Sequence, residues 1–473
     1  MSLIAELKGL KRNQVHSIWA SYLGWTLDAF DFFLLVFMLS AIAKEYGTDI
    51  KTVSEATFLT LAARPFGAFA FGWMADRFGR RPIMMIVILL FSLFSFASAF
   101  AWSLTSLFVI RTLFGFCMGG EWGIGASLVM ESIPIKLRGP VSGLLQSGYP
   151  SGYFLASLVF FLLFDMVGWR GMFMVGIAPA ILVFLIRMHV EESPAFEKRR
   201  HERPANPIGE LVRNWKIALY LVILMTAFNF FSHGTQDLYP TFLKEQHHFD
   251  TKTIGLLAMI GNVGAIVGGI SFGIWSEHIG RKRAIIIASL LALPIIPLWS
   301  YSSTPLMLGV GAFLIQVAVQ GAWGIVPVHL NELSPALVRG MFPGFAYQLG
   351  NLIASRNGPI QAGIAESHGG NYGLALALVA GVTVVVLTFW TLIGPQRHEG
   401  ELSDGHEPPM NVNALGLGLA TLGFALGAVL FVFADQIDTS GEIYRALWVG
   451  AAALFLGGWA IDRKTPATVE AIR

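Results

Sequence analysis

The chain has 473 residues, of which 55% are hydrophobic and only 13% are Asp, Glu, Lys or Arg. Soluble proteins carry about 25% charged residues, so this composition excludes an ordinary soluble globular protein. A net charge of +2 without a long basic block argues against nucleic acid as a partner. Cys117 is the single cysteine, which excludes an internal disulfide framework and a cysteine-based metal site.

Long apolar runs predict that the chain crosses a lipid bilayer many times. A helix needs about 20 apolar residues to span roughly 30 Å of hydrocarbon, and fourteen runs meet that length. The first run lacks a small-residue cleavage site and is expected to be a retained helix. The predicted spans are 17–41, 54–75, 82–101, 104–130, 140–164, 169–189, 216–243, 253–276, 284–302, 305–331, 341–365, 371–394, 411–433 and 443–461.

Loop charges predict the orientation of these spans. Lys and Arg gather in the loops on the side of the N-terminus, which marks that side as cytoplasmic. We expect a multi-pass protein of the plasma (cell inner) membrane with both termini in the cytoplasm. The predicted organisation is an N-terminal six-helix half (1–190), a charged, Pro-containing cytoplasmic linker (191–215), a C-terminal six-helix half (216–395), and a linker with an accessory two-helix hairpin (396–473).

An internal repeat relates the two halves. Shifting the sequence by 201 positions places three separate motifs on their own copies. Residues 72–81 fall on 273–282, residues 120–124 fall on 321–325, and residues 131–139 fall on 332–340. Parallel repeats of this kind predict a rocking transporter whose binding site lies between the halves, near the membrane midplane.

The loop GWMADRFGRRP at 72–82 and its copy GIWSEHIGRKR at 273–283 resemble the signature loop of the major facilitator superfamily. The resemblance implies an all-α integral membrane bundle of 6+6 transmembrane helices, here with two extra C-terminal transmembrane helices. We expect the loop charges to lock the two halves together at the cytoplasmic face without touching substrate. The expected cytoplasmic gate comprises Asp76, Arg77, Arg80, Glu131, Arg138, Glu277, Arg281, Glu332 and Arg339.

Residues 229–241, NFFSHGTQDLYPT, are similar to the N-x-x-[ST]-H-x-[ST]-Q-D-x-x-x-T motif of fungal-type lactate and pyruvate permeases in the sialate:proton symporter subfamily. The resemblance implies that Asn229, His233 and Asp237 handle substrate and protons. The segments LDAFDFF at 27–33 and GGEWGIGASLVMES at 119–132 are also typical of that subfamily.

Ionisable groups at membrane depth cost about 2.5–3.5 kcal/mol each, so they indicate partners or a water-filled cavity. On a helix, Asn229, His233, Gln236 and Asp237 fit one stripe that is expected to face the bundle interior. His233 is either a proton-exchanging group beside Asp237 or a neutral, hydrogen-bonded core residue.

Other acidic residues are competing proton carriers. Asp31 and Arg111 are expected at similar depth, either as an ion pair that opens when Asp31 is protonated or as a permanent structural salt bridge. Glu121, in the middle of its span, is a second candidate, and Asp28 is a weaker one because it can instead face a helix interface.

An anionic substrate needs a cation, and a guanidinium matches a carboxylate with two parallel hydrogen bonds. We expect Arg356 to bind the carboxylate, with Arg64 as the alternative, and Asn357 to contact a 2-hydroxy or 2-oxo oxygen. Either arginine could instead pair with an acidic residue of the bundle. Tyr347 and Gln348 are candidates for the cavity wall.

The sequence contains no nucleophile elbow, nucleotide-binding loop or HExxH motif, which argues against an enzyme. We expect no cofactor and no metal, with H+ as the coupling ion. The leading hypothesis is a monomeric, proton-coupled symporter of small monocarboxylates such as lactate and pyruvate, in contact with lipid and a small carboxylate. Sialic acid, an aromatic acid or a dicarboxylate are alternative substrates. A membrane nutrient receptor is the alternative class, although a receptor normally carries a larger soluble extension.

Overall fold

The computed structural model describes residues 3–395, apart from residue 49, several positions between 178 and 189, and residues 200–205. Within those residues the fold is entirely helical, as the apolar runs predict. The main helices are α1 (Leu3–Lys8), α2 (Arg12–Tyr46), α3 (Ile50–Phe78), α4 (Arg80–Ser98), α5 (Leu104–Gly119), α6 (Glu121–Ser132), α7 (Arg138–Gln146), α8 (Gly148–Val175), α10 (Pro194–Arg199), α11 (Pro207–Arg213), α12 (Trp215–Gln236), α13 (Tyr239–Thr241), α14 (Thr251–Ile279), α15 (Arg281–Tyr301), α16 (Pro305–Trp323), α17 (Val326–Leu333), α18 (Phe342–Ala354), α19 (Asn357–Ser367) and α20 (Tyr372–Ile393).

The helices follow the predicted spans closely. Each of the first twelve predicted spans coincides with one helix or with a succession of helical segments, and the fifth and sixth spans share α8. Beyond Val175 the sixth span is described only in part. Nine helical segments of the described residues are long and apolar enough to cross a membrane. The predicted spans 411–433 and 443–461 lie outside the described residues.

Several spans are broken into two helices near the middle of the bundle. The break between α5 and α6 falls at Gly120, and the corresponding break between α16 and α17 falls at Gly324 and Ile325. Pro327 then lacks the N–H that a continuous helix would use there. The helix α8 turns at Gly168, whose φ of 63° strains any residue with a side chain.

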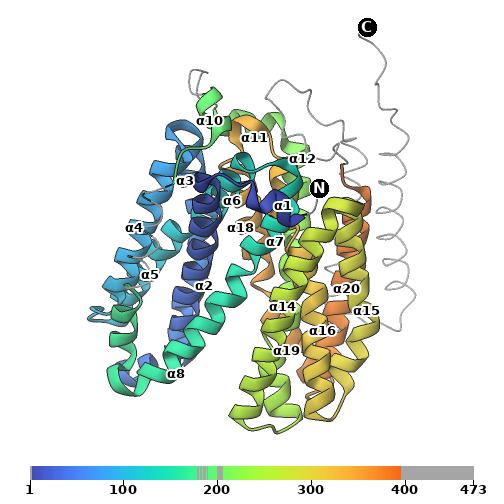
Figure 1. The fold of residues 1–473 in the computed structure, drawn as a ribbon. Coiled ribbons are helices and arrows are strands. Elements are labelled where there is room, and N and C mark those ends of the chain that lie inside the picture. The colour runs from blue at the N-terminus through green and yellow to red at the C-terminus, as the bar shows by residue number, and fades with distance from the viewer. Residues whose placement is uncertain are drawn as a thin grey trace.

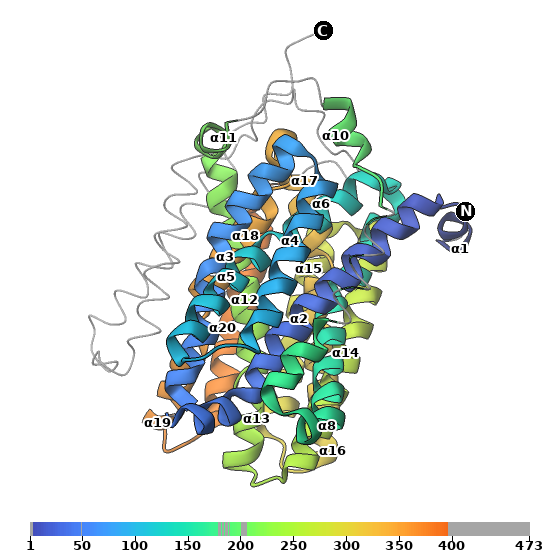
Figure 2. The same ribbon diagram turned by 90° about the vertical axis from the view of Figure 1, so that its left-hand side faces the viewer.

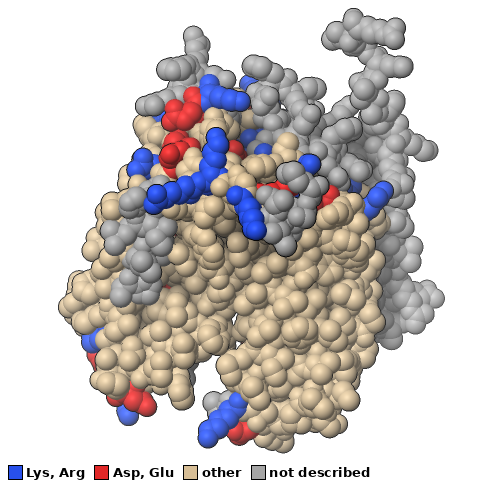
Figure 3. Space-filling view, viewed as in Figure 1, with Lys and Arg blue, Asp and Glu red and all other residues tan. Residues whose placement is uncertain are grey.

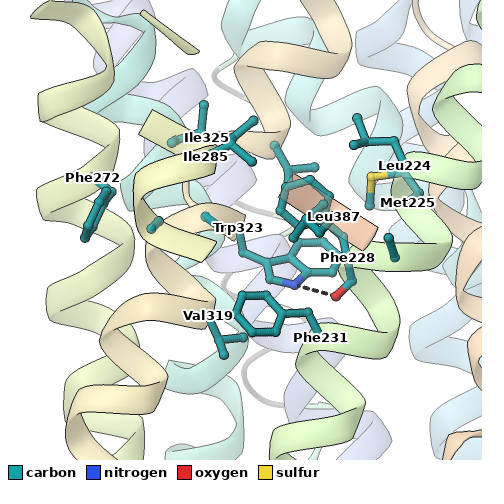
Figure 4. Packing of buried hydrophobic residues seen from close by; sticks show 14 of the residues in the cluster. Leu224, Met225, Phe228, Phe231, Phe272, Ile285, Val319, Trp323, Ile325 and Leu387 are labelled. Carbon is teal, nitrogen blue, oxygen red and sulfur yellow. Dashed lines mark hydrogen bonds between the residues drawn. The ribbon is translucent and has the colours of Figure 1, made fainter. Parts of the chain in front are cut away.

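The helices form two bundles that stand side by side (Figure 1, and turned by 90° in Figure 2). The first contains α2 to α8, and the second contains α12 to α20. One apolar core belongs to the first bundle alone, and the other fills the second bundle and continues to its contacts with the first. Figure 4 shows part of the second core, where Trp323 Nε1 donates a hydrogen bond of 3.1 Å to the carbonyl of Phe228.

The bundles touch at one end and part at the other. Lys, Arg, Asp and Glu gather at the end that carries the two loop motifs, which we call the motif end, and a cleft opens between the bundles at the opposite end (Figure 3). At the motif end, backbone meets backbone across the boundary. A Cβ built on Gly143 would lie 2.3 Å from the carbonyl oxygen of Gly269, and one on Gly123 would lie 2.7 Å from Cα of Gly344. Together with Gly72 and Met341, these residues form the glycine seam.

Replacing Gly143 with Val should force the seam apart, because no rotamer removes the clash of Cβ with a backbone carbonyl. We expect a thiol reagent to label a cysteine at the buried Ser334 faster in Gly143→Val, in a background where Cys117 is Ser. Gly381→Val is the matched control, since no atom lies within 4 Å of a Cβ built there. Equal labelling in both variants would contradict this account of the seam.

Candidate functional site: a gate and a polar cleft

Two carboxylates at the motif end bind backbone N–H groups of the opposite bundle. Asp76, near the end of α3, accepts hydrogen bonds from the N–H groups of Gly340 (2.8 Å) and Met341 (3.0 Å). Glu277, at the repeat-related position on α14, accepts one from the N–H of Gly139 at 2.5 Å. The 201-residue offset therefore relates the two bonds to one another, and each bundle holds the other in the same way.

Ion pairs surround these two bonds. Arg80 contacts Asp76 at 2.9 Å and Glu131 at 3.3 Å, and Arg281 contacts Glu277 at 2.7 Å and Glu332 at 3.3 Å. A further pair of 3.7 Å joins Arg339 to Glu131 across the boundary between the bundles.

Two other arginines of the expected gate have different surroundings. Arg138 donates its Nε–H to the carbonyl of Met130 at 2.9 Å, close to the ion pairs. Arg77 is exposed, with its guanidinium over the rings of Trp73 and Phe78, and among the described residues it makes no ion pair with this network. The structure thus groups the expected gate residues without Arg77.

The segment after the sixth predicted span completes the gate, which the sequence did not indicate. Glu192 accepts hydrogen bonds from the N–H groups of Arg80 and Arg81, both at 3.1 Å. The buried hydroxyl of Ser193 donates to the Glu131 carboxylate. In the sequence, Glu192 and Ser193 are two ordinary residues of a charged loop. Only their contacts with Arg80, Arg81 and Glu131 show that they belong to the gate.

The cleft contains the polar stripe of α12. His233 Nδ1 lies 3.1 Å from the Asp237 carboxylate, and His233 Nε2 lies 3.0 Å from Oδ1 of Asn351 on α18. Both side chains of the His-Asp pair are partly accessible, at 26% for His233 and 40% for Asp237. Asn229 is buried and donates instead to the carbonyl of Met225 at 2.7 Å, which turns it toward its own helix. The pair therefore has both a fixed geometry and access to water.

Five aromatic rings lie between this pair and the glycine seam, and we call them the aromatic plug. They are Trp25, Trp122 and Tyr149 of the first bundle, and Trp323 and Tyr347 of the second. The Tyr347 ring centroid is 4.8 Å from that of Trp122 and 5.6 Å from that of Trp323, so this ring joins the two bundles.

The position of the plug follows from α18. Along this helix, Gly344 belongs to the glycine seam, Tyr347 to the aromatic plug, and Asn351 contacts His233, each about one turn from the next. Gln348, on the same helix, is buried, and its Oε1 makes no hydrogen bond within the described residues. Tyr347, a candidate wall residue in the sequence, thus packs between the rings of Trp122 and Trp323 and closes the cleft on the side of the motif end.

The two candidate arginines have different surroundings. Arg64 on α3 is buried, and its Nη2 contacts the Met118 sulfur at 2.9 Å. It interacts electrostatically with Tyr149 of the first bundle and with His233 and Tyr347 of the second.

Arg356, in contrast, is exposed at the start of α19, and within the described residues its side chain makes no hydrogen bond or ion pair. Its neighbour Asn357 is buried and donates to Gln361 at 3.1 Å, which in turn donates to the carbonyl of Gly234 at 2.7 Å. Of the two arginines, Arg64 is therefore the one that interacts electrostatically with His233, and the preference for Arg356 that the sequence suggests finds no support in its surroundings.

The buried charges of the first bundle form a separate group. Asp31 accepts a hydrogen bond from Ser95 at 3.1 Å, and the Arg111 guanidinium lies 3.8 Å from the ring centroid of Phe114. The two charges interact electrostatically, but they do not form the expected ion pair within 4.0 Å. Asp28 and Glu121 are also buried, and Asp28 interacts electrostatically with Tyr347.

Two helical bundles that meet at one end and part at the other (Figure 3), with a polar cleft between them, are the architecture expected of a membrane transporter. The chain belongs to the Major Facilitator Superfamily, whose family model matches residues 22–354 and 238–469, and this assignment makes it a transporter and not an enzyme.

Comparisons with known proteins agree with this assignment. The chain is 27% identical over 440 residues to a carboxylic acid transporter protein homolog of Saccharomyces cerevisiae, covering 85% of this chain and 71% of the relative. It is 28% identical over 385 residues to the sialic acid transporter NanX of Escherichia coli, covering 80% and 92%. The proton:xylose symporter XylE has the same fold, with a TM-score of 0.70 at 16% identity over 83% of this chain and 98% of XylE.

Proposed function

We propose that this transporter is a proton-coupled symporter of small monocarboxylates such as lactate and pyruvate. In this proposal residues 1–190 and 216–395 are the two halves that rock about the cleft, the motif end faces the cytoplasm, and the membrane is the plasma (cell inner) membrane. The structure is then the outward-open form, because the gate is closed and the opposite end is open.

The observation that carries the proposal is the partly accessible His233–Asp237 pair of the second bundle, with whose histidine the buried Arg64 of the first bundle interacts electrostatically. A carboxylate needs a fixed cation, and a coupled proton needs a group that can gain and lose charge within reach of water. Arg64 supplies the first on one bundle, and Asp237 with His233 supplies the second on the other. Substrate and proton are thereby bound between the parts that move.

Asn351 orients the proton site through its contact with His233 Nε2. When substrate and proton are both bound, the Arg64 charge and the Asp237 charge are each neutralised. The cleft can then close without burying an uncompensated charge, which would otherwise cost several kcal/mol. Parting of the aromatic plug and then of the gate would open the path to the cytoplasm.

The named relatives support an acid as the substrate, since one is a carboxylic acid transporter homolog and another a sialic acid transporter. Sialic acid therefore stays the alternative substrate.

The test is uptake of labelled lactate into proteoliposomes containing the full chain, with and without an inward proton gradient, with unlabelled lactate, pyruvate or sialic acid as competitors. We expect uptake that the gradient accelerates and that lactate and pyruvate inhibit. If only unlabelled sialic acid inhibited the uptake, the substrate would be sialic acid and not a small monocarboxylate. Binding of lactate without uptake would indicate a receptor.

A further inference from the structure

A chain of side-chain hydrogen bonds runs from the cleft into the second bundle. Gln236, the last residue of α12, donates its Nε2 to Oε1 of Gln316 on α16 at 2.9 Å. Gln316 in turn donates its Nε2 to the hydroxyl of Thr235 at 3.3 Å. Gln316 and Thr235 are buried, and Gln236 is partly accessible. Gln236 is therefore the accessible end of this series of hydrogen bonds.

The direction of these bonds is fixed at the buried end. The Thr235 hydroxyl lies 3.0 Å from the carbonyl of Phe231 and 3.1 Å from that of Ser232, and a carbonyl can only accept. The single hydroxyl proton therefore points to the backbone, and the Thr235 oxygen can receive a hydrogen bond. Gln316 must turn its NH2 group toward Thr235, which leaves its Oε1 for Gln236.

The same logic orients Gln236. Its NH2 group has to face the Gln316 oxygen, because two amide oxygens in contact would repel each other. Its own Oε1 then points away from Gln316 and accepts no hydrogen bond from any described residue. The backbone of α12 thus determines, through two intermediate side chains, that the partly accessible Gln236, next to Asp237, keeps its amide oxygen available as an acceptor.

We propose that Gln316 is a positioning residue that makes the site select a 2-hydroxy acid over the matching 2-oxo acid. This inference rests on the proposed function, in which Arg64 holds the substrate carboxylate. A hydroxyl next to that carboxylate can donate to Gln236 Oε1, whereas a keto oxygen cannot donate and would meet the amide oxygen instead. Lactate should consequently bind better than pyruvate.

The test compares the half-saturation constants for lactate and pyruvate in proteoliposomes of variants of the full chain. Thr235→Val has nearly the same shape but removes the hydroxyl that sets the direction, so both amides can turn over. We expect its preference for lactate to fall by roughly two- to ten-fold, the effect of one neutral hydrogen bond. In Gln316→Leu, which removes the side chain between Thr235 and Gln236, the preference for lactate should fall by a similar factor. Thr235→Ser keeps the hydroxyl and should restore the preference.

Thr226→Val is the matched control, because the Thr226 hydroxyl makes the same kind of bond to the carbonyl of Val222 on α12 but holds no second side chain. A general loosening of α12 would alter the maximal rate in Thr226→Val and Thr235→Val alike without changing the ratio of the two half-saturation constants. An unchanged ratio in Thr235→Val and Gln316→Leu would overturn the inference. If neither acid is transported by the unmodified chain, the proposed function itself fails, which is a different result.

Discussion

Replacing Arg64 with Lys should raise the half-saturation constant for lactate by about ten- to hundred-fold. Lysine keeps the charge but loses the planar pair of donors, and a hydrogen bond to a charged group contributes about 1.5–3 kcal/mol. The contact of Arg64 Nη2 with the Met118 sulfur is a weak one that a carboxylate would readily replace. Binding of labelled lactate to the purified, folded variant measures the effect directly.

Arg356→Lys is the control for this experiment, because Arg356 is exposed and its side chain contacts none of the cleft residues described above. We expect its lactate affinity to equal that of the unmodified chain. The opposite pattern, with normal lactate binding in Arg64→Lys and weak binding in Arg356→Lys, would show that Arg356 and not Arg64 binds the substrate carboxylate.

Asp237→Asn should abolish accumulation of lactate against a gradient while exchange of internal for external lactate continues. The amide can still form a hydrogen bond to His233 Nδ1, so the geometry of the pair is kept, but it cannot take up a proton. Counterflow and gradient-driven uptake in the same proteoliposomes separate the two activities.

Asp250→Asn is the matched control. Asp250 caps α14 outside the helices that cross the membrane, and its hydrogen bond from Thr253 holds the pKa of this carboxyl below its usual range. It therefore stays ionised near neutral pH, and Asn is an equally good cap. Accumulation should be normal in this variant. If Asp237→Asn still accumulates lactate, Asp31 or Glu121 carries the proton.

The helices were predictable because lipid leaves the backbone few choices. A run of apolar residues of sufficient length has to form a helix in the membrane, since its N–H and C=O groups have no water to bind. The breaks at Gly120, Gly324 and Ser355 were not predictable. Glycine is common inside membrane helices for close packing, so its presence alone does not distinguish a contact from a break.

Side-chain direction limited the prediction of the site. Similar depth in the membrane suggested an Asp31–Arg111 pair, but depth does not fix which face of each helix the residues occupy, and Arg111 lies against Phe114. The adjacent Asn357 favoured Arg356 over Arg64 in the sequence, but adjacency in the chain does not make two side chains face the same way, and Asn357 is buried while Arg356 is exposed. The α12 motif, in contrast, predicted that His233 and Asp237 are neighbours, because positions four apart share one helical face. Asn351 had no such partner in its own helix, and only the packing of α18 against α12 reveals it.

The glycine seam has an energetic consequence for the transport cycle. A surface made of side chains must give up rotamer freedom each time it closes, at up to about 2 kcal/mol for a long side chain, whereas glycine has no side-chain entropy to lose. Closing Gly143 onto Gly269 and Gly123 onto Gly344 therefore freezes nothing beyond the backbone, which is already helical. An interface that opens and closes on every turnover requires closed and open states of nearly equal free energy. Contact of backbone with backbone keeps the entropic cost of closing small, so neither state is strongly favoured over the other.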